Sequence, residues 1–318
     1  MKAAVLHRIG ECPVFEDVPE PVPAPGEQLV QVTAAPLNAI DRALAAGSHY
    51  ARPDALPAVP GVVGAGRLPD GARVLFGSQG GTMAERAATG PQWCYPIPDS
   101  VDDALAAAAW NPGLSAWMAL TWQAELQPGQ TVLVQGATGV TGKLAVQLAR
   151  RLGAGRIVAS GRNPETLRRL AELGADTTIA LETAGAELAA AYAAAAGDSG
   201  YDLILDYLWG NPTEVLLDAL GNHDLRPRSA RTRLIQVGEM AGTHVSLPAG
   251  VLRSAGIEIS GMGSGTMPPR EVIERGLAEL MGLLERGELH VDFDRVPLSR
   301  VAEVWAHDQR GRRPVFVP

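Results

Sequence analysis

Hydrophobic and polar positions change their spacing along the chain, and the change is clearest after residue 131. Short apolar runs rich in β-branched side chains alternate there with longer stretches of helical spacing, which is typical of buried strands joined by helices. Strands are expected at residues 131–134, 156–160, 177–181, 201–208 and 232–237. Helices are expected at 140–152, from the capping sequence Asn163-Pro164-Glu165, and at the alanine-rich run 186–196. This order predicts a doubly wound parallel sheet.

The first hundred residues follow another pattern. Short apolar runs at 28–32 and 73–76 are separated by the turn clusters 23–26 and 69–71, which are rich in Pro and Gly and predict a β-rich domain. Beyond Asp102 the spacing lengthens to a helix at 103–110, a break at Asn111-Pro112-Gly113, and a second helix at 114–122.

The last segment mixes both kinds of element. It predicts a strand at 256–261, a helix at 269–286, a strand near 291–293, a helix at 299–307 and a strand at 314–317. We therefore expect residues 1–113 to form the first part of the β-rich domain and 114–255 the nucleotide-binding domain. Residues 256–318 are expected to supply the last strand of the parallel sheet and the return to the first domain.

Composition limits the classes of function. The 318 residues are 46% hydrophobic and 19% charged, as in a globular protein of about two domains. A net charge of −8 without a basic block argues against nucleic acid as a partner. No apolar stretch reaches the roughly 18 residues of a membrane span, so we expect no membrane partner and a cytoplasmic location. Cys12 and Cys94 provide neither a disulfide framework nor a thiolate zinc cluster.

A glycine-rich loop lies between the expected strand 131–134 and the helix that follows. It reads Gly136-Ala137-Thr138-Gly139-Val140-Thr141-Gly142. The first Gly permits a tight turn, the second a close approach to a pyrophosphate, and the third close packing of the helix on the strand. Helix N–H groups would then face the phosphates. Lys143 in the first turn is either a phosphate contact or a solvated lysine.

The end of the second strand distinguishes two dinucleotide cofactors. NAD sites usually carry an acidic residue there, about 20 positions after the loop, whereas this chain has Ser160-Gly161-Arg162. A guanidinium binds a 2′-phosphate, so NADPH is the expected cofactor, with Gly238 after the strand 232–237 as a further contact. The basic loop 226–233 could also approach the phosphate, although we interpret it as a solvated surface.

Several segments, in this order, resemble the medium-chain dehydrogenase/reductase superfamily and its zinc-free quinone oxidoreductase branch. They are 60–66 (PGVVGAG), 113–120 (GLSAWMAL), 126–134 leading into the glycine loop, 201–206 (YDLILD) and 311–315 (GRRPV). The resemblance covers nearly the whole chain. It implies an α/β protein with a GroES-like, β-rich catalytic domain and a doubly wound Rossmann domain that binds NADPH.

The resemblance also implies a reaction without a metal. Zinc-dependent members carry Cys at the position of Asn38 and Gly-His-Glu where this chain has Gly61-Val62-Val63. The zinc-free branch is similar to enzymes that transfer hydride from NADPH to a quinone or an α,β-unsaturated carbonyl, with hydrogen-bond donors for the oxyanion. Asn38 matches the family's Asn near nicotinamide and substrate. His49 and Tyr50 are candidate proton donors, although the family's aromatic residue is missing at Ala43 and its Gly-x-Tyr is altered.

Two alternative functions and an assembly prediction complete this interpretation. A short-chain-type reductase shares the glycine pattern but requires Tyr-x-x-x-Lys, and the only lysines are Lys2 and Lys143. An NADPH-binding sensor or structural protein would bind the cofactor with little turnover. The segment Ile257-Glu258-Ile259-Ser260 resembles the edge strand through which zinc-free relatives pair, so a homodimer is expected.

Overall fold

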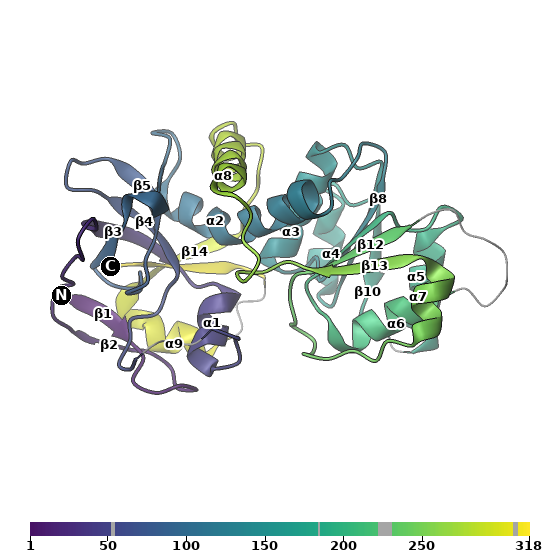
Figure 1. Ribbon diagram of the computed structural model, residues 1–318, viewed down its shortest axis with the longest axis horizontal. Helices are drawn as coiled ribbons and strands as arrows, with labels where there is room; N and C mark the ends of the chain where they lie inside the picture. The colour runs from purple at the N-terminus through teal and green to yellow at the C-terminus, as the bar shows by residue number, and fades with distance from the viewer. Residues whose placement is uncertain (52–54, 184, 222–230, 308–310) are drawn as a thin grey trace. The chain divides into compact units, whose positions relative to one another are not determined.

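The computed structural model describes residues 1–51, 55–183, 185–221, 231–307 and 311–318 (Figure 1). The chain divides into two compact units. Unit 1 comprises Met1–Leu114 and Glu274–Pro318, and unit 2 comprises Ser115–Ile273. Within the described ranges, no helix has the length and apolar character needed to cross a bilayer.

Unit 2 is built on a parallel sheet with the strand order β10-β9-β8-β11-β12-β13. The strands are β8 (Thr131–Gln135), β9 (Arg156–Gly161), β10 (Thr177–Ala180), β11 (Leu203–Asp206), β12 (Thr232–Gln236) and β13 (Ile257–Gly261). The chain enters at β8, winds outward to β10, then returns to β11 on the other side of β8. The strand order therefore reverses between β8 and β11, which is where doubly wound folds bind their ligands.

Helices cover the sheet of unit 2 (Figure 1). They are α3 (Val140–Arg151), α4 (Pro164–Leu170), α5 (Ala186–Ala196), α6 (Gly210–Leu220) and α7 (Ala249–Ala255). Side chains of α5, α6 and α7, among them Leu188, Leu216 and Val251, share one core with inward residues of the strands. Helix α3 contacts β8 and β9, and α4 contacts β9 and β10. The predicted doubly wound sheet is confirmed.

Unit 1 contains a mixed sheet with the order β14-β15-β3-β4-β5-β7, in which β6 pairs with β3, and a separate hairpin of β1 and β2. Its strands are β1 (Lys2–Val5), β2 (Val14–Asp17), β3 (Gln28–Pro36), β4 (Val63–Arg67), β5 (Arg73–Gly77), β6 (Arg86–Thr89), β7 (Cys94–Pro96), β14 (Phe293–Pro297) and β15 (Arg313–Val317). The helical pieces are α1 (Ala39–Ala46), η1 (Pro91–Trp93), η3 (Leu298–Arg300) and α9 (Val301–Ala306). This is the β-rich architecture that the sequence predicts.

Two long helices, α2 (Asp103–Met118) and α8 (Arg270–Glu285), begin in different units. The predicted break at Asn111-Pro112-Gly113 is wrong, because α2 continues through Pro112 and ends in a π-helical turn, η2 (Ala119–Gln123). Most of this helix is buried, Ala106 to Ala109 completely, and a helix that is apolar on all sides is stabilised by burial. That burial outweighs the cost of about 3 kcal/mol for a proline inside a helix.

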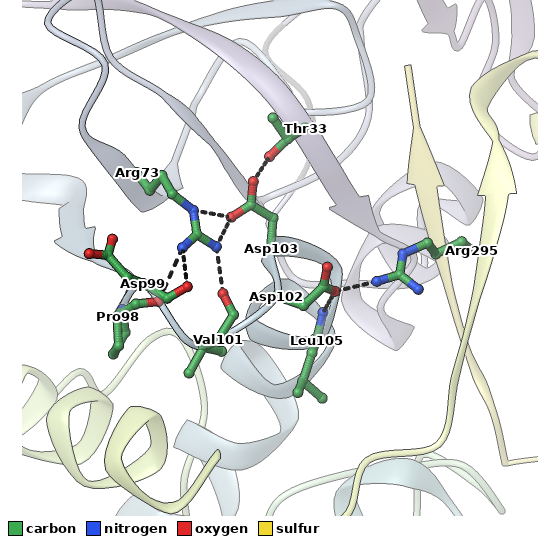
Figure 2. Close-up of polar contacts among 9 residues, drawn as sticks. All are labelled: Thr33, Arg73, Pro98, Asp99, Val101, Asp102, Asp103, Leu105 and Arg295. Atoms are coloured by element: carbon green, nitrogen blue, oxygen red, sulfur yellow. Dashed lines mark hydrogen bonds and ion pairs between the residues drawn. The ribbon is translucent and has the colours of Figure 1, made fainter. Parts of the chain in front are cut away.

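Charged side chains fix the first turn of α2 in unit 1 (Figure 2). Arg73 donates to Asp103 and to the carbonyl oxygens of Pro98, Asp99 and Val101, and Thr33 donates to the other oxygen of Asp103. Asp102 accepts from the N–H of Leu105 and pairs with Arg295 of β14 at 2.6 Å. The start of α2 is thereby joined to β3, β5 and β14. All three nitrogens of the Arg73 guanidinium donate to acceptors of the protein itself. We therefore interpret this cluster as structural.

The predicted strand near 291–293 is shifted in the structure, where β14 begins at Phe293. Its sequence, FDRVP, has no run of apolar residues, and Asp294 and Arg295 are exposed. Pairing with β15, in the register Phe293↔Arg313, defines the strand instead. Apolar periodicity cannot locate an edge strand of this kind.

Candidate functional site

Three glycines shape the turn between β8 and α3, each for a different reason. Gly136 has φ of +87°, a conformation that favours glycine. A Cβ at Gly142 would lie 2.5 Å from both the Cα of Ala137 and the carbonyl oxygen of Gly136, so only glycine lets the helix pack this closely. At Gly139, in contrast, φ is −77°, and a Cβ would find its nearest atom at 3.6 Å. The fold itself does not require glycine at position 139.

The first turn of α3 presents backbone donors. An α-helix leaves its first N–H groups without intrahelical partners, and here these belong to Val140, Thr141 and Gly142, while the N–H of Lys143 donates to Gly139 O at 3.0 Å. The dipole of the helix adds positive potential at this end. Lys143 is 7% exposed. Of the two roles predicted for it, phosphate contact or solvated side chain, this burial contradicts the second.

The end of β9 supports the glycine loop. The carbonyl oxygen of Ser160 accepts from the N–H groups of Gly136 at 3.1 Å and Ala137 at 2.7 Å. The Ser160 hydroxyl is fully buried and has no hydrogen-bond partner among the described residues. A Cβ at Gly161 would meet the Thr138 side chain at 2.3 Å, so this strand end can approach the loop only as glycine.

Arg162 follows directly and its side chain is exposed. The next residue, Asn163, caps α4 by accepting from the N–H of Thr166 at 2.9 Å, as its sequence predicts. The end of β9 therefore offers a guanidinium and an amide but no carboxylate. Residues 226–230 of the basic loop lie outside the described residues, while Arg231 pairs with Glu258 at 3.1 Å.

The ends of β11 and β12 meet beside the glycine loop. Val237 and Gly238 both donate their N–H groups to the carbonyl oxygen of Asp206, at 2.8 and 3.1 Å. A Cβ at Gly238 would lie 2.7 Å from Tyr207 O, and one at Gly136 would lie 3.0 Å from the Leu208 side chain. Unit 2 thus brings the predicted residues Gly136 to Lys143, Ser160 and Gly238 to one edge of the sheet, where its strand order reverses.

A buried polar network that the sequence analysis missed lies beneath this edge. The carboxylate of Asp206 accepts from Thr213 Oγ1 at 2.6 Å, from Gln135 Nε2 at 3.2 Å and from the N–H groups of Leu208 and Trp209. Tyr192 donates to Gln135 Oε1 at 2.7 Å, and burial raises the pKa of Tyr192. These bonds join β8, β11, α5 and α6, so the ends of the central strands are fixed from below.

In unit 1, Asn38 lies between β3 and α1 and is 1% exposed. Its Nδ2 donates to the carbonyl oxygen of Pro36 over 3.4 Å, which is long, and its Oδ1 has no hydrogen-bond partner in the part of the chain that the structure describes. An unpaired buried polar atom is unfavourable unless a ligand or water satisfies it. The Asn38 carboxamide can therefore accept a hydrogen bond from a ligand or water at Oδ1.

Two buried charged residues accompany Asn38. Asp41 accepts the N–H of Asn38 at 2.7 Å and that of Val62 at 3.0 Å, and burial raises the pKa of Asp41 to about 6. Arg313 of β15 donates to Leu37 O at 2.9 Å, and burial lowers the pKa of Arg313 to about 10. Each charge opposes the shift of the other. Arg313 was missed because it is 276 positions from its partner, and no local pattern marks it.

His49 and Tyr50 lie beyond the other end of α1. The His49 and Tyr50 ring centroids are 4.0 Å apart, His49 Nδ1 accepts the N–H of Ala51 at 3.0 Å, and Tyr50 is 70% exposed. Between them and Asn38 lie the eight residues of α1, a length of about 12 Å. The three predicted catalytic residues thus belong to one helix and its flanks, but α1 separates the rings from the carboxamide.

Comparisons with known proteins agree with this architecture. The sequence model of a family described as zinc-binding dehydrogenase matches residues 140–275. The probable NADPH-dependent quinone reductase tdiC of Emericella nidulans is 29% identical, over 96% of this chain and 97% of that protein.

Solved structures give the same picture. The quinone oxidoreductase of Thermus thermophilus, described alone and with NADPH, is 28% identical and superposes over 100% of both chains with a TM-score of 0.83. The Escherichia coli quinone oxidoreductase complexed with NADPH superposes over 100% of both chains with a TM-score of 0.88. It is 21% identical, so this second similarity concerns the fold.

Proposed function

Because the chain belongs to the medium-chain dehydrogenase/reductase superfamily, in its quinone oxidoreductase-like branch, we propose that it is an NADPH-dependent, zinc-independent oxidoreductase. Its proposed substrates are quinones or α,β-unsaturated carbonyl compounds. The observation that carries the proposal is the glycine loop at the reversal of strand order, next to a strand end that bears Arg162 and no carboxylate.

The residues at this edge fit a dinucleotide phosphate. The N–H groups of Val140, Thr141 and Gly142 are suited to the pyrophosphate, since charge-assisted bonds to backbone donors at a helix N-terminus bind phosphate well. Gly139 leaves open the space that a Cβ would fill. Arg162 is suited to the 2′-phosphate that distinguishes NADPH from NADH. The unpaired hydroxyl of Ser160 lies at the same strand end.

The proposed reaction needs little from the protein beyond binding and orientation. Bound NADPH supplies the hydride. The substrate's conjugated carbonyl receives the negative charge, and Asn38 Nδ2 is the proposed donor to that oxyanion. Turning the carboxamide toward a ligand would break the long contact with Pro36 and the side-chain interaction with Asp41. His49 or Tyr50 is the proposed source of the proton, which would pass to the substrate through water because α1 separates both rings from Asn38. Since His49 Nδ1 accepts a hydrogen bond, the neutral ring carries its proton on Nε2 and donates from there.

Zinc has no role in this proposal because the donors at the matching positions do not suit it. Asn38 offers an amide, Val62 and Val63 offer aliphatic side chains, and both oxygens of the neighbouring Asp41 already accept backbone N–H groups. Zinc is bound by thiolate, imidazole and carboxylate. Across the described parts of the chain, no group of three or more such residues is placed to hold a metal.

A turnover assay tests the function. Oxidation of NADPH is followed by its absorbance, with a panel of quinones and enones, before and after treatment with a chelator. We expect saturable oxidation with at least one of these acceptors, unchanged by the chelator. Binding of NADPH without turnover on any acceptor would contradict the proposal and favour the sensor alternative. Loss of activity with the chelator, restored by zinc, would contradict zinc independence.

A further inference from the structure

The peptide bond between Leu37 and Asn38 is held from both sides by buried charges. Arg313 Nη1 donates to the carbonyl oxygen of this bond at 2.9 Å, and Asp41 Oδ2 accepts its N–H at 2.7 Å. Asp41 is 1% exposed and Arg313 is 7% exposed. Rotation of this peptide would break charge-assisted hydrogen bonds, which are about twice as strong as neutral ones.

The second oxygen of Asp41 extends this arrangement to another segment. It accepts the N–H of Val62 at 3.0 Å, immediately before β4. One carboxylate therefore joins the start of α1 to the loop that leads into β4. The side chain of Arg42, on the same helix, is directed elsewhere and donates to carbonyl oxygens at the end of α9.

Capping of α1 does not by itself require two buried charges. Helix α4 is capped by the neutral side chain of Asn163, which accepts from the N–H of Thr166. At α1, burial raises the pKa of Asp41 to about 6 and lowers the pKa of Arg313 to about 10. Both charged forms are therefore less favourable here than in water. Burying charged groups costs desolvation free energy, and such groups are often no more stabilising than apolar residues of similar size, so the two buried charges suggest a role other than stability.

We propose that Asp41 and Arg313 are positioning residues that clamp the Leu37–Asn38 peptide and thereby set the direction in which the Asn38 carboxamide meets the substrate. This inference rests on the proposed function of Asn38. The carboxamide depends on its backbone because its own bonds are few: Nδ2 has a contact of 3.4 Å with Pro36, the side chain interacts with Asp41, and Oδ1 has no partner among the described residues. With the peptide held on both sides, the Cα–Cβ direction of Asn38 is fixed.

A double-mutant cycle tests the clamp. We expect Asp41→Asn to lower kcat roughly ten- to hundredfold, the effect of misplacing a reacting group by about 1 Å. The KM for NADPH is expected to stay within about twofold, because the proposed phosphate contacts lie in unit 2. In an Asn38→Ala background, Asp41→Asn should cause no further loss of kcat, since Asp41 acts through Asn38. Equal losses in both backgrounds would overturn the proposal.

Further variants keep the test independent of one substitution. Arg313→Met removes the charge and the donor, whereas Arg313→Lys keeps the charge and should recover part of the lost kcat. If Asp41→Asn fails to fold, Arg313→Met replaces it in the same cycle. Arg42→Gln, one residue beyond Asp41 on α1, serves as the matched control and should leave kcat unchanged. Equal activity of Arg313→Lys and Arg313→Met would contradict the clamp.

A readout without turnover separates this inference from the proposed function. If the wild-type protein fails to oxidise NADPH with any of the tested acceptors, the proposed function fails. The clamp is then tested by NMR on isotope-labelled protein. The side-chain amide signals of Asn38 should shift or broaden in Asp41→Asn and Arg313→Met and stay in place in Arg42→Gln. Unchanged Asn38 signals in both clamp variants would overturn the inference.

Discussion

Replacement of Gly139 by alanine separates a ligand-binding role of the glycine loop from a packing role. The backbone of Gly139 has φ of −77° and ψ of 166°, which suits any residue, and a Cβ would lie 3.6 Å from Gly136 O, an ordinary contact. Gly139 is the N-cap of α3, where alanine is less favourable than glycine, so we expect Gly139→Ala to fold with at most about 1 kcal/mol lower stability. The new methyl group occupies the space through which a pyrophosphate would approach the backbone.

The size of the effect follows from contact distances. An N–H group holds a phosphate oxygen at about 2.9 Å, whereas a methyl carbon keeps it about 3.5 Å away, so the ligand must retreat. Loss of one hydrogen bond to a charged group costs about 1.5–3 kcal/mol. This corresponds to roughly 10- to 150-fold weaker binding of NADPH. Calorimetric titration at fixed salt measures the affinity, and urea unfolding measures the stability.

Two other glycines provide the contrast. Gly142→Ala brings a methyl group to 2.5 Å from Ala137 Cα and should reduce both stability and affinity, since overpacking typically costs about 1–3 kcal/mol. Gly250→Ala, in α7, places the new Cβ more than 4 Å from every described atom outside its neighbours and should leave affinity unchanged. An unchanged Kd in Gly139→Ala would refute the phosphate role of this loop. A loss of stability above the roughly 1 kcal/mol expected for an N-cap would show that the fold itself uses the space assigned to the ligand.

Three further predictions concern cofactor choice, pH and assembly. Arg162→Ala should weaken NADPH binding about ten- to hundredfold with little effect on NADH; equal losses in calorimetry would remove Arg162 from the 2′-phosphate site. The raised pKa of Asp41, about 6 against 3.8, means that its stabilising contribution is full below about pH 4 and is lost as pH rises through 6. The unfolding free energy of wild type relative to Asp41→Asn should therefore fall by about 2.4 kcal/mol between pH 4 and pH 7, and a constant difference in urea titrations would contradict the shift. We also propose a homodimer through the edge strand β13, in which Ile259 is half-buried. Sedimentation should then show a dimer that Ile259→Lys splits, and a wild-type species near the chain mass of 33.3 kDa would contradict it.

Local signals carried most of the prediction of unit 2. The spacing of apolar residues and the length of each segment distinguish strands from helices. Gly136 and Gly142 directly indicate a tight turn followed by a closely packed helix. The predicted helix 186–196 coincides with α5. The break predicted at Pro112 is wrong because burial by surrounding elements stabilises the helix despite its proline. No local sequence pattern indicates that burial.

The candidate site in unit 1 was less accessible to sequence reasoning. Asn38 follows from the resemblance, and its capping partner Asp41 lies three residues away, within range of a local pattern. Arg313 reaches Leu37 only because β15 pairs with β3, a contact that topology creates. His49 and Tyr50 are near Asn38 in sequence, but the length of α1 separates them in space.

Because β15 comes late in the chain, synthesis on the ribosome can complete unit 2 before unit 1. Unit 2 is one continuous segment, and its strands can pair as soon as that segment has emerged. Unit 1 places β15, residues 313–317, between β14 and β3, about 200 residues after its first part ends. At translation rates of about 5–20 residues per second, that first part must wait roughly 10–40 s for its missing strand. Throughout this interval Ala35 and Pro36 of β3 lack the partners Phe316 and Val315, and an unpaired strand edge is open to other chains. Protection of this edge during synthesis is therefore a requirement that the topology itself imposes.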